Sequence, residues 1–340
     1  MATAPLTTKP TPERIFNTLN AFQSTAALKT AFELDFFTAI AEGADQATTL
    51  AKKVAVAERG ARILADYLTI HGFLTKENDR YALVPEIAMF VDRRSPAYMG
   101  SVIGFLASER HKQSFERLTE AVRAGGSVMP EADNSQPHQE MWVAFAKSMA
   151  PLTGPSAAFM AQLAGMQEHK QCKILDVAAS HGMFGITFAK QNPNAQIVAL
   201  DWPAVLEVAK ENATTAGLAD RVRLLPGSAF EVDLGTDYDF VLLTNILHHF
   251  DKPTCEKLLR RMHAALKPGG RVITLEFVPN EDRVSPPTAA GFSLIMLTGT
   301  AAGDAYTFSE YQTMFKHAGF AKSTLHPLPT GPQQVVVSEK

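Results

Sequence analysis

Residues 173 to 201 read KILDVAASHGMFGITFAKQNPNAQIVALD, and they predict a strand, a tight turn, a helix and a second strand. The apolar run at residues 174–177 is typical of a strand that is buried on both faces. The small residues from Ala178 to Gly182 allow a sharp turn, and Asn192-Pro193 ends the helix that follows it. This order of elements predicts the βαβ unit that opens a nucleotide-binding sheet.

The polar residues of this unit indicate which kind of ligand it binds. Asp201 ends the second strand, where a bound nucleoside presents its ribose hydroxyls. The turn keeps only Gly182 and Gly185 of the glycines that let a backbone approach a pyrophosphate. Asp176 adds a carboxylate near the turn, which suits a cationic amino group. S-adenosylmethionine has a ribose, a sulfonium, an amino group and no phosphate, so we expect it as the ligand. The alternative is an ordinary βαβ crossover with a surface aspartate.

The composition is that of an ordinary globular protein. The 340 residues are 46% hydrophobic and 20% charged, with a formal net charge of -3, and they suffice for two domains with their own cores. This charge gives no basic field for nucleic acid or anionic lipid. Cys172 and Cys255 lack metal-like spacing, which predicts a reducing cytoplasm and no structural metal site. The sequence has no signal-peptide core and no long apolar run, so neither export nor membrane insertion is expected.

The first part of the chain carries the pattern of a winged helix-turn-helix. Apolar residues at helical spacing predict two helices at 12–22 and 25–34, and two more at 48–54 and 58–71. Two short β-segments at 73–83 complete the order helix, helix, ribbon. Acidic and basic residues are mixed on the last helix and the ribbon, so counterion release on DNA would contribute little. We therefore favour a structural or dimerising role over DNA binding.

The rest of the chain predicts a doubly wound parallel sheet, an α/β fold of the Rossmann type with ligands at the carboxyl ends of its strands. A breaker-rich loop at 125–137 and a helix with a Trp, Phe and Met stripe precede it. We expect a mostly α winged-helix domain over residues 1–150 and the sheet domain over residues 151–340. Further strands are expected at 222–225, 238–243, 271–277 and 334–337, and further helices at 203–216, 253–266 and 309–318.

Five motifs occur in the order of a known family: Ile174 to Val177, Leu200-Asp201, Leu247 to Phe250, Leu266 to Gly270 and Ala318 to Phe320. With them the chain resembles the class I S-adenosylmethionine-dependent methyltransferases. More narrowly, it is similar to the O-methyltransferases typified by plant caffeic acid and bacterial polyketide-tailoring enzymes. That family also opens with a winged-helix-like dimerisation domain, so the resemblance covers nearly the whole chain. It implies a homodimer formed through the N-terminal domain, a small-molecule acceptor, and S-adenosylhomocysteine as the product.

The resemblance also implies roles for particular residues. The family's cofactor loop falls on Ala178 to Gly182, its ribose acid on Asp201, and Trp202 lies beside the adenine. His248 matches the general base, and Glu276 matches the acid that supports it. The expected cofactor-binding residues are Asp176, Ala178, Ser180, Gly182, Asp201, Trp202, Ser228, Ala229, Phe230 and Thr244.

The sequence departs from the family's pattern at three places. The residues Ala178, Ala179 and Ser180 replace a glycine triplet, which affects how the methionine portion of the cofactor is held. Ser228 stands where the family usually has an aspartate. A second acid that supports the base in the plant enzymes has no clear equivalent, and Asp304 is a candidate for it.

One base suffices for this chemistry, because the sulfonium methyl is already an activated electrophile. An imidazole titrates near neutral pH, and Glu276 bonded to one ring nitrogen of His248 would leave the other to accept a proton. His249 is an alternative base, and a packed or capping role is the alternative for His248. Bulky and soft side chains, some of them in an apolar insert at 291–303, indicate a flat or aromatic acceptor with a hydroxyl. The expected acceptor pocket is formed by Phe145, Met149, His249, Phe292, Met296 and Leu297.

Two further functions fit the same sequence. One is methyl transfer to nitrogen, sulfur or carbon of a small molecule, in which His248 would matter less. The other is a non-catalytic S-adenosylmethionine-binding regulator that uses the winged helix on DNA. A basic surface on residues 58–71 would favour the regulator, and the mixed charge of that segment speaks against it.

Overall fold

The computed structural model describes residues 10–129 and 139–340, and the chain forms two compact units. The N-terminal unit spans Met1–Ala107 and the C-terminal unit spans Ser108–Lys340. The helices between residues 108 and 150, assigned above to the first domain, group with the C-terminal unit because they pack on its helices. The expected domain limits, 1–150 and 151–340, stay a prediction.

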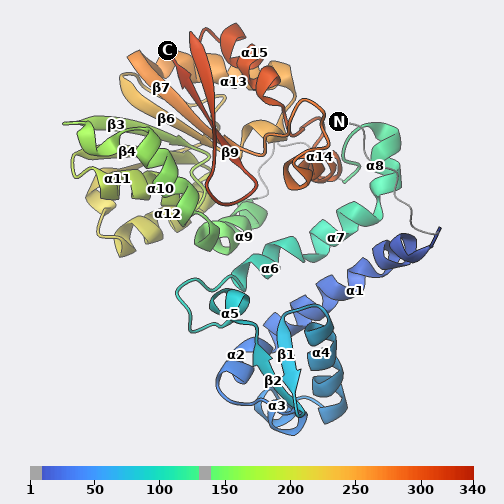
Figure 1. Ribbon diagram of the computed structural model, residues 1–340. Helices are drawn as coiled ribbons and strands as arrows, with labels where there is room; N and C mark the ends of the chain where they lie inside the picture. Colours follow the sequence, from blue (N-terminus) through green and yellow to red (C-terminus); the bar gives the residue numbers. More distant parts are fainter. Residues whose placement is uncertain (1–9, 130–138) are drawn as a thin grey trace. The chain divides into compact units, whose positions relative to one another are not determined.

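The N-terminal unit has the order of a winged helix-turn-helix (Figure 1). Its elements are α1 (Glu13–Glu33), α2 (Phe36–Ala41), α3 (Ala47–Lys53), α4 (Glu58–Ile70), β1 (Leu74–Glu77), β2 (Arg80–Leu83), α5 (Pro85–Val91) and α6 (Ser101–Leu106). β1 and β2 pair antiparallel around Asn78 and Asp79, whose φ angles of 47° and 61° suit a tight hairpin turn. The core of the unit contains the buried side chains of Phe36, Phe37, Leu50, Leu68, Leu74 and Tyr81.

The first helix is longer than the sequence pattern predicts. The two helices expected at 12–22 and 25–34 form the single helix α1, because no glycine or proline interrupts residues 13–33. In its middle, the hydroxyl of Ser24 lies 3.0 Å from that of Tyr67 on α4 and forms a hydrogen bond with it. The helix leaves large apolar side chains 58–68% exposed on its N-terminal half: Ile15, Phe16, Leu19 and Phe22.

The C-terminal unit alternates strands and helices after a helical entry. Its helices are α7 (Glu109–Glu116), α8 (Leu118–Ala124), α9 (Gln139–Met149), α10 (Gly154–Leu163), α11 (Met183–Gln191), α12 (Pro203–Thr215), α13 (Lys252–Ala265), α14 (Pro287–Gly299) and α15 (Phe308–His317). Its strands are β3 (Cys172–Val177), β4 (Ala195–Asp201), β5 (Val222–Pro226), β6 (Tyr238–Thr244), β7 (Leu266–Glu276), β8 (Lys322–Pro327) and β9 (Gln334–Glu339). Short 3-10 turns occur at Ala150–Leu152, Met166–Glu168, Ala219–Arg221 and Leu247–His249.

The strands form one seven-stranded sheet in the order β5-β4-β3-β6-β7-β9-β8. The first five are parallel, and β9 runs antiparallel to both of its neighbours. The expected doubly wound α/β fold is confirmed, but the expectation of a fully parallel sheet is wrong at β9. β8 is not predicted from the sequence, because its residues KSTLHP are mostly polar and only partly buried at the sheet edge.

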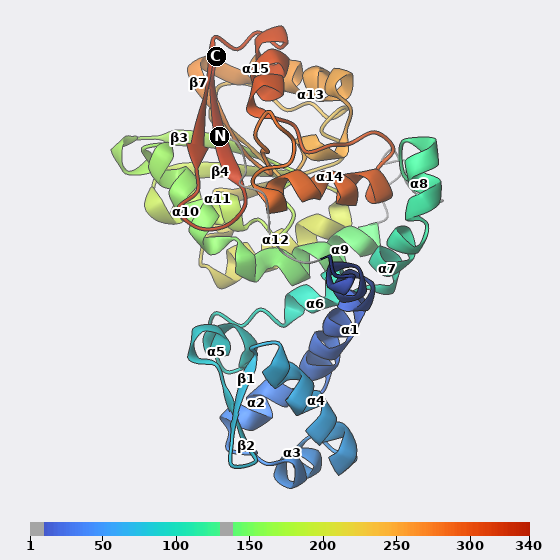
Figure 2. The ribbon, with the colours of Figure 1, turned by 45° about the vertical axis from the view of Figure 1, so that its right-hand side comes forward.

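Helices cover both faces of this sheet (Figures 1 and 2). Alternate residues of β3 point to opposite layers. Leu175 and Val177 belong to the core shared with α13 and α15, whereas Ile174 belongs to the core shared with α10 and α11. Because β3, β4, β6 and β7 are parallel, their carboxyl ends meet at one edge of the sheet, and the turns that follow them lie together.

Candidate active site

The turn after β3 keeps a glycine-like backbone with only one glycine in it. The φ angles are 53° at Ala178, 53° at Ser180 and 72° at Gly182, all in the left-handed region that L residues rarely adopt. A Cβ added to Gly182 would lie 3.0 Å from the Cβ of Ala209 on α12, so the turn is pressed against that helix. Ala178 and Ser180 therefore hold a conformation that favours glycine, at a strain of about 1–2 kcal/mol for each of them.

A buried histidine inside this turn, which is not predicted from the sequence, holds the turn in place. Nδ1 of His181 accepts a hydrogen bond from the N–H of Met183 at 3.1 Å, so Nε2 carries the proton and donates to Oγ1 of Thr153 at 3.0 Å. Burial lowers the pKa of His181 to about 4, so the ring is neutral. Asn212 of α12 donates to the carbonyl of His181 at 2.8 Å. A polar residue between the small residues of a turn is the only local signal of this anchor.

Asp201 connects the turn after β3 with the turn after β4. Its Oδ2 accepts from the N–H of Ser180 at 2.8 Å, and its Oδ1 accepts from the N–H of Trp202 at 2.7 Å. Burial raises the pKa of Asp201 to about 6, although these two bonds oppose the shift. Each carboxylate oxygen keeps a further acceptor site, so the residue can also bind a pair of ligand hydroxyls.

Asp176 is fully buried beneath the same turn. Its Oδ2 accepts from the N–H of Gly185 at 3.0 Å, while its Oδ1 has no hydrogen-bond partner within residues 10–129 and 139–340. Burial, together with the negative charge of Asp201, raises the pKa of Asp176 to about 7. The buried hydroxyl oxygen of Ser180 is also unpartnered in this part of the chain. Unpaired buried acceptors are costly, so these atoms fit a ligand that brings a cationic donor.

The turn after β5 and the end of β6 carry the remaining residues expected at the cofactor. The N–H of Gly227 donates to the carbonyl of Asp201 at 2.9 Å, which places Ser228 and Ala229 beside the end of β4. The hydroxyl of Ser228 accepts from the N–H of Phe230 at 3.2 Å. The remaining expected residue, at the end of β6, is the buried Thr244.

Glu276, at the end of β7, organises the turn that carries His248. Its Oε1 accepts from the N–H groups of Ile246 at 3.0 Å and Leu247 at 2.9 Å, and its Oε2 lies 2.5 Å from Nδ1 of His248. Both side chains are buried. A carboxylate accepts all three bonds at once, so Nδ1 of His248 carries the ring proton. Nε2 has no hydrogen-bond partner among the described residues and keeps a lone pair that can accept a proton.

His249 lies next to His248 but lacks such a partner. The two ring centroids are 4.4 Å apart, and Trp142 of α9 approaches the ring of His249 at 5.4 Å and a right angle. Burial and the neighbouring His248 lower the pKa of His249 well below its ordinary value. The ring is therefore neutral, and no carboxylate of the described residues fixes its tautomer. Of the two histidines, His248 has the geometry of an oriented base.

Aromatic side chains surround the pair of histidines. Phe292 of α14 meets the ring of His248 edge-on at 4.8 Å and stacks on Phe277 at 3.9 Å. Phe145 packs on Trp142 with their ring centroids 5.9 Å apart, and Trp142 contacts His249, so α9 contributes to the aromatic surroundings of the two histidines through Trp142. Met296 is buried on α14, whereas Met149 and Leu297 are half-buried, at the end of α9 and on α14. The apolar insert expected at 291–303 is thus the helix α14 and the turn after it.

The candidate for a second supporting acid makes other contacts. Oδ2 of Asp304 forms an ion pair with Arg283 at 3.1 Å, and Oδ1 accepts from the N–H of Ala305. Within the described part of the chain it has no hydrogen bond to His248 or Glu276. The described residues also contain no cluster of three or more His, Cys, Asp or Glu side chains suited to a metal ion, and no helix long and apolar enough to cross a membrane.

Both parts of the chain match models of known protein families. Residues 125–321 match the model of the O-methyltransferase domain, and residues 16–91 match the O-methyltransferase dimerisation domain. The chain belongs to the O-methyltransferase family. This O-methyltransferase is an enzyme that acts on small molecules, and its cofactor is S-adenosylmethionine.

Relatives of this O-methyltransferase span almost its whole length. The 3-hydroxy-5-methyl-1-naphthoate 3-O-methyltransferase of Streptomyces sahachiroi is 29% identical over 87% of this chain and 85% of its own. Mouse acetylserotonin O-methyltransferase is 26% identical over 96% of this chain and 89% of its own. A crystal structure from Nostoc punctiforme, provisionally described as an O-methyltransferase, has a TM-score of 0.94 and 51% identity, and the match covers 98% of this chain and 100% of that one.

Proposed function

We propose that this enzyme methylates a hydroxyl of a small aromatic acceptor and that His248 is the general base. The pairing of Glu276 with Nδ1 of His248 at 2.5 Å carries this proposal, because it leaves Nε2 free beside an aromatic wall. Relatives named for a hydroxynaphthoate and for acetylserotonin support an aromatic acceptor. Since the chain is an enzyme of this family, we set the non-catalytic regulator aside.

The chain's own residues perform the steps around the transferred methyl group. When bound, S-adenosylmethionine supplies an activated methyl electrophile. Nε2 of His248 takes the proton of the acceptor hydroxyl, and Glu276 stabilises the imidazolium that forms. The stacked rings of Phe292 and Phe277 orient a flat acceptor against the base, so alignment contributes much of the acceleration. Asp201 and the turn at 178–182 hold the ribose and the methionine portion, and Asp176 balances the cationic amino group.

Methylation at carbon is the second candidate, and one relative favours it. The L-tyrosine C(3)-methyltransferase of Streptomyces lavendulae is 24% identical over 80% of this chain. Deprotonation of a phenol by His248 would also activate the ring carbon beside the oxygen, so the site itself does not separate the two outcomes. A carbon–carbon bond to the new methyl group in the product, read by NMR, would replace the O-methyl proposal. Methyl transfer to nitrogen or sulfur would depend less on His248 as a proton acceptor.

The Asp201→Ala variant tests the proposed cofactor site. We expect its affinity for S-adenosylhomocysteine in calorimetric titration to fall by about 10-fold to 100-fold, because charge-assisted hydrogen bonds to the ribose are lost. Asp220→Ala is the matched control, since Asp220 is an exposed acid of the same unit. Equal affinities in wild type and Asp201→Ala would move the ribose contact to another residue. If the wild type does not bind S-adenosylhomocysteine, the result would contradict a cofactor site at the turn of residues 178–182.

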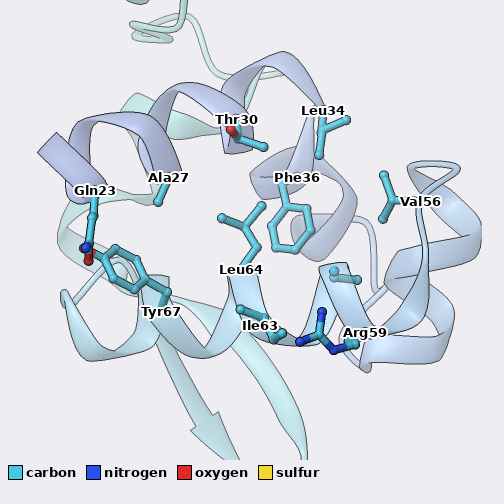
Figure 3. Close-up of a pocket in the computed structure, with 12 residues that line it drawn as sticks. Gln23, Ala27, Thr30, Leu34, Phe36, Val56, Arg59, Ile63, Leu64 and Tyr67 are labelled. Carbon is cyan, nitrogen blue, oxygen red and sulfur yellow. The ribbon is translucent and has the colours of Figure 1, made fainter.

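We also propose a homodimer formed through the N-terminal unit. Its helix α1 exposes a stripe of large apolar side chains, and a groove of about 550 Å³ lies between α1 and α4 in the same unit. Figure 3 shows Leu64, Phe36 and Tyr67 facing this groove. Exposed apolar surface of this kind marks protein interfaces. None of the residues expected to bind cofactor or acceptor lines the groove.

DNA is a poorer partner for this unit than a second copy. Arg62 of α4 and Lys76 of the ribbon are both paired with Asp66, at 3.0 Å and 2.8 Å. Paired cations release few counterions from DNA.

A cytoplasmic location is part of the proposal, and the free cysteines Cys172 and Cys255 support it.

The Leu19→Glu variant tests the dimer. We expect the mass measured by light scattering to fall from two chains to one chain of 36.9 kDa, because a buried unpaired charge opposes association. Val284→Glu is the control: Val284 is 71% exposed in the C-terminal unit, so its variant should keep the dimer mass. A monomeric wild type would contradict the dimer itself. A dimeric Leu19→Glu variant would place the interface elsewhere.

A further inference from the structure

Residues 126–128, which we call the strap, follow α8 and close the C-terminal end of α14. The N–H of Ser127 donates to the carbonyl of Thr300 at 2.8 Å, and its hydroxyl donates to the carbonyl of Thr298 at 2.7 Å. The last carbonyls of a helix have no partner inside the helix, so the strap supplies what α14 lacks. A Cβ added to Gly126 would lie 2.2 Å from the carbonyl oxygen of Ala301, so the two backbones are in direct contact.

The strap is itself held by the helices that lead into it. Arg117, at the junction of α7 and α8, donates to the carbonyl of Val128 at 2.7 Å. Both α7 and α8 pack on α14, and α8 lies beside α14 in both views (Figures 1 and 2). The strap is therefore fixed on one side to α7 and α8, and on the other to the end of α14.

The turn after α14 rests on the backbone of the proposed base. A Cβ added to Gly303 would lie 2.1 Å from the carbonyl oxygen of His248 and 2.9 Å from the carbonyl carbon of His249. The buried hydroxyl of Thr300 accepts from the N–H of Gly303 at 2.9 Å and donates to the carbonyl of Met296 at 2.7 Å. No flexible side chain separates this turn from His248, so a displacement of the turn is passed directly to the base.

α14 also reaches the ring of the base. Phe292 lies one to two turns before the strapped end of the helix and meets the ring of His248 at 4.8 Å. The turn after α14 thus touches the backbone of His248, and Phe292 in the helix touches its side chain. Packed contacts of this kind have few alternative arrangements, so fixing the end of the helix fixes both.

We propose that the strap positions His248, with Gly126 and Ser127 acting through α14 and Gly303. This inference rests on the proposed function, in which His248 is the base. None of the strap residues is among those assigned to the acceptor or the cofactor, so we class them as positioning residues and not catalytic ones. The geometry of a base within a few tenths of an ångström decides how well it takes a proton, and a displacement of about 1 Å can cost about 100-fold in rate.

The Ser127→Ala variant removes one of the two bonds that hold α14. Ser114→Ala is its matched control, because the hydroxyl of Ser114 also donates to a backbone carbonyl at 2.8 Å, but within α7. The first readout needs no acceptor. It is the NMR resonance of the proton on Nδ1 of His248, measured in apo protein with isotope-labelled histidine and assigned by its loss in His248→Asn. We expect this resonance to shift in Ser127→Ala and Gly126→Ala and to stay in place in Ser114→Ala.

The second readout is turnover of whichever acceptor the wild type accepts. We expect kcat/KM for the acceptor to fall by about 10-fold to 100-fold in Ser127→Ala, with S-adenosylhomocysteine affinity unchanged. Ser127→Thr, which retains a hydroxyl, should recover most of this loss. An unmoved His248 resonance in both strap variants would overturn the inference, whether or not the proposed function holds. An equal shift in Ser114→Ala would overturn it too, because it would show general loosening of α7 and α8.

Discussion

His248→Asn should lower kcat by about 100-fold to 10,000-fold, the range expected when a general base is removed, while S-adenosylhomocysteine affinity stays unchanged. The reason is geometric: Nε2 is the ring nitrogen that Glu276 leaves free, and asparagine cannot accept a proton there. The measurement is initial rate and calorimetric affinity for the same protein sample. An unimpaired variant would remove His248 as the base.

Two companions make this result specific. Glu276→Gln should also lose activity, because an amide lacks the negative charge that stabilises the imidazolium. The amide NH2 group is also a donor, whereas the N–H groups of Ile246 and Leu247 need an acceptor. His263→Asn is the control, since His263 lies on α13 against Phe320 and belongs to neither the cofactor nor the acceptor site. An active His248→Asn beside an inactive His249→Asn would transfer the role of base to His249.

The parts of this site that depend on local sequence could be predicted. α11 occupies Met183–Gln191 as expected, and Asp201 ends β4, because a buried apolar run, small turn residues and a helix-ending Asn-Pro are all local signals. The pairing of His248 with Glu276 also follows from the fold expected for the chain. Each residue comes at or just after the end of a strand, and β6 and β7 are adjacent and parallel.

Contacts set by packing over long distances could not be predicted. The close approach of Gly303 to the carbonyl of His248 brings together residues far apart in sequence. A glycine in a loop is common, so nothing in the local sequence predicts this contact. His181 reads as one polar residue in a turn, yet its neutral ring ties that turn to Thr153. β8 is missed because edge strands lack the apolar run that identifies central ones.

Asp176→Asn should stabilise the apo enzyme above neutral pH and abolish cofactor binding. Burial raises the pKa of Asp176 to about 7, above its value of about 4 in an unfolded chain. The stability that this group contributes is therefore complete below about pH 4 and is lost as the pH rises through about 7. Asparagine keeps an acceptor for the N–H of Gly185 and stays uncharged, so the variant should gain roughly 2–4 kcal/mol of unfolding free energy at about pH 8.

The same substitution removes the charge that we assign to the amino group of the cofactor. Urea titrations of the apo proteins at about pH 5 and about pH 8 should show a difference that grows with pH, whereas the exposed-site control Asp220→Asn should show none. Saturating S-adenosylhomocysteine should reverse the order, because it stabilises the wild type alone. If Asp176→Asn binds S-adenosylhomocysteine as tightly as the wild type does, Asp176 does not contact the amino group of the cofactor. A variant no more stable than wild type at about pH 8 would mean that the Asp176 carboxylate is already compensated in the apo enzyme, and that its unpaired oxygen is not kept for a ligand.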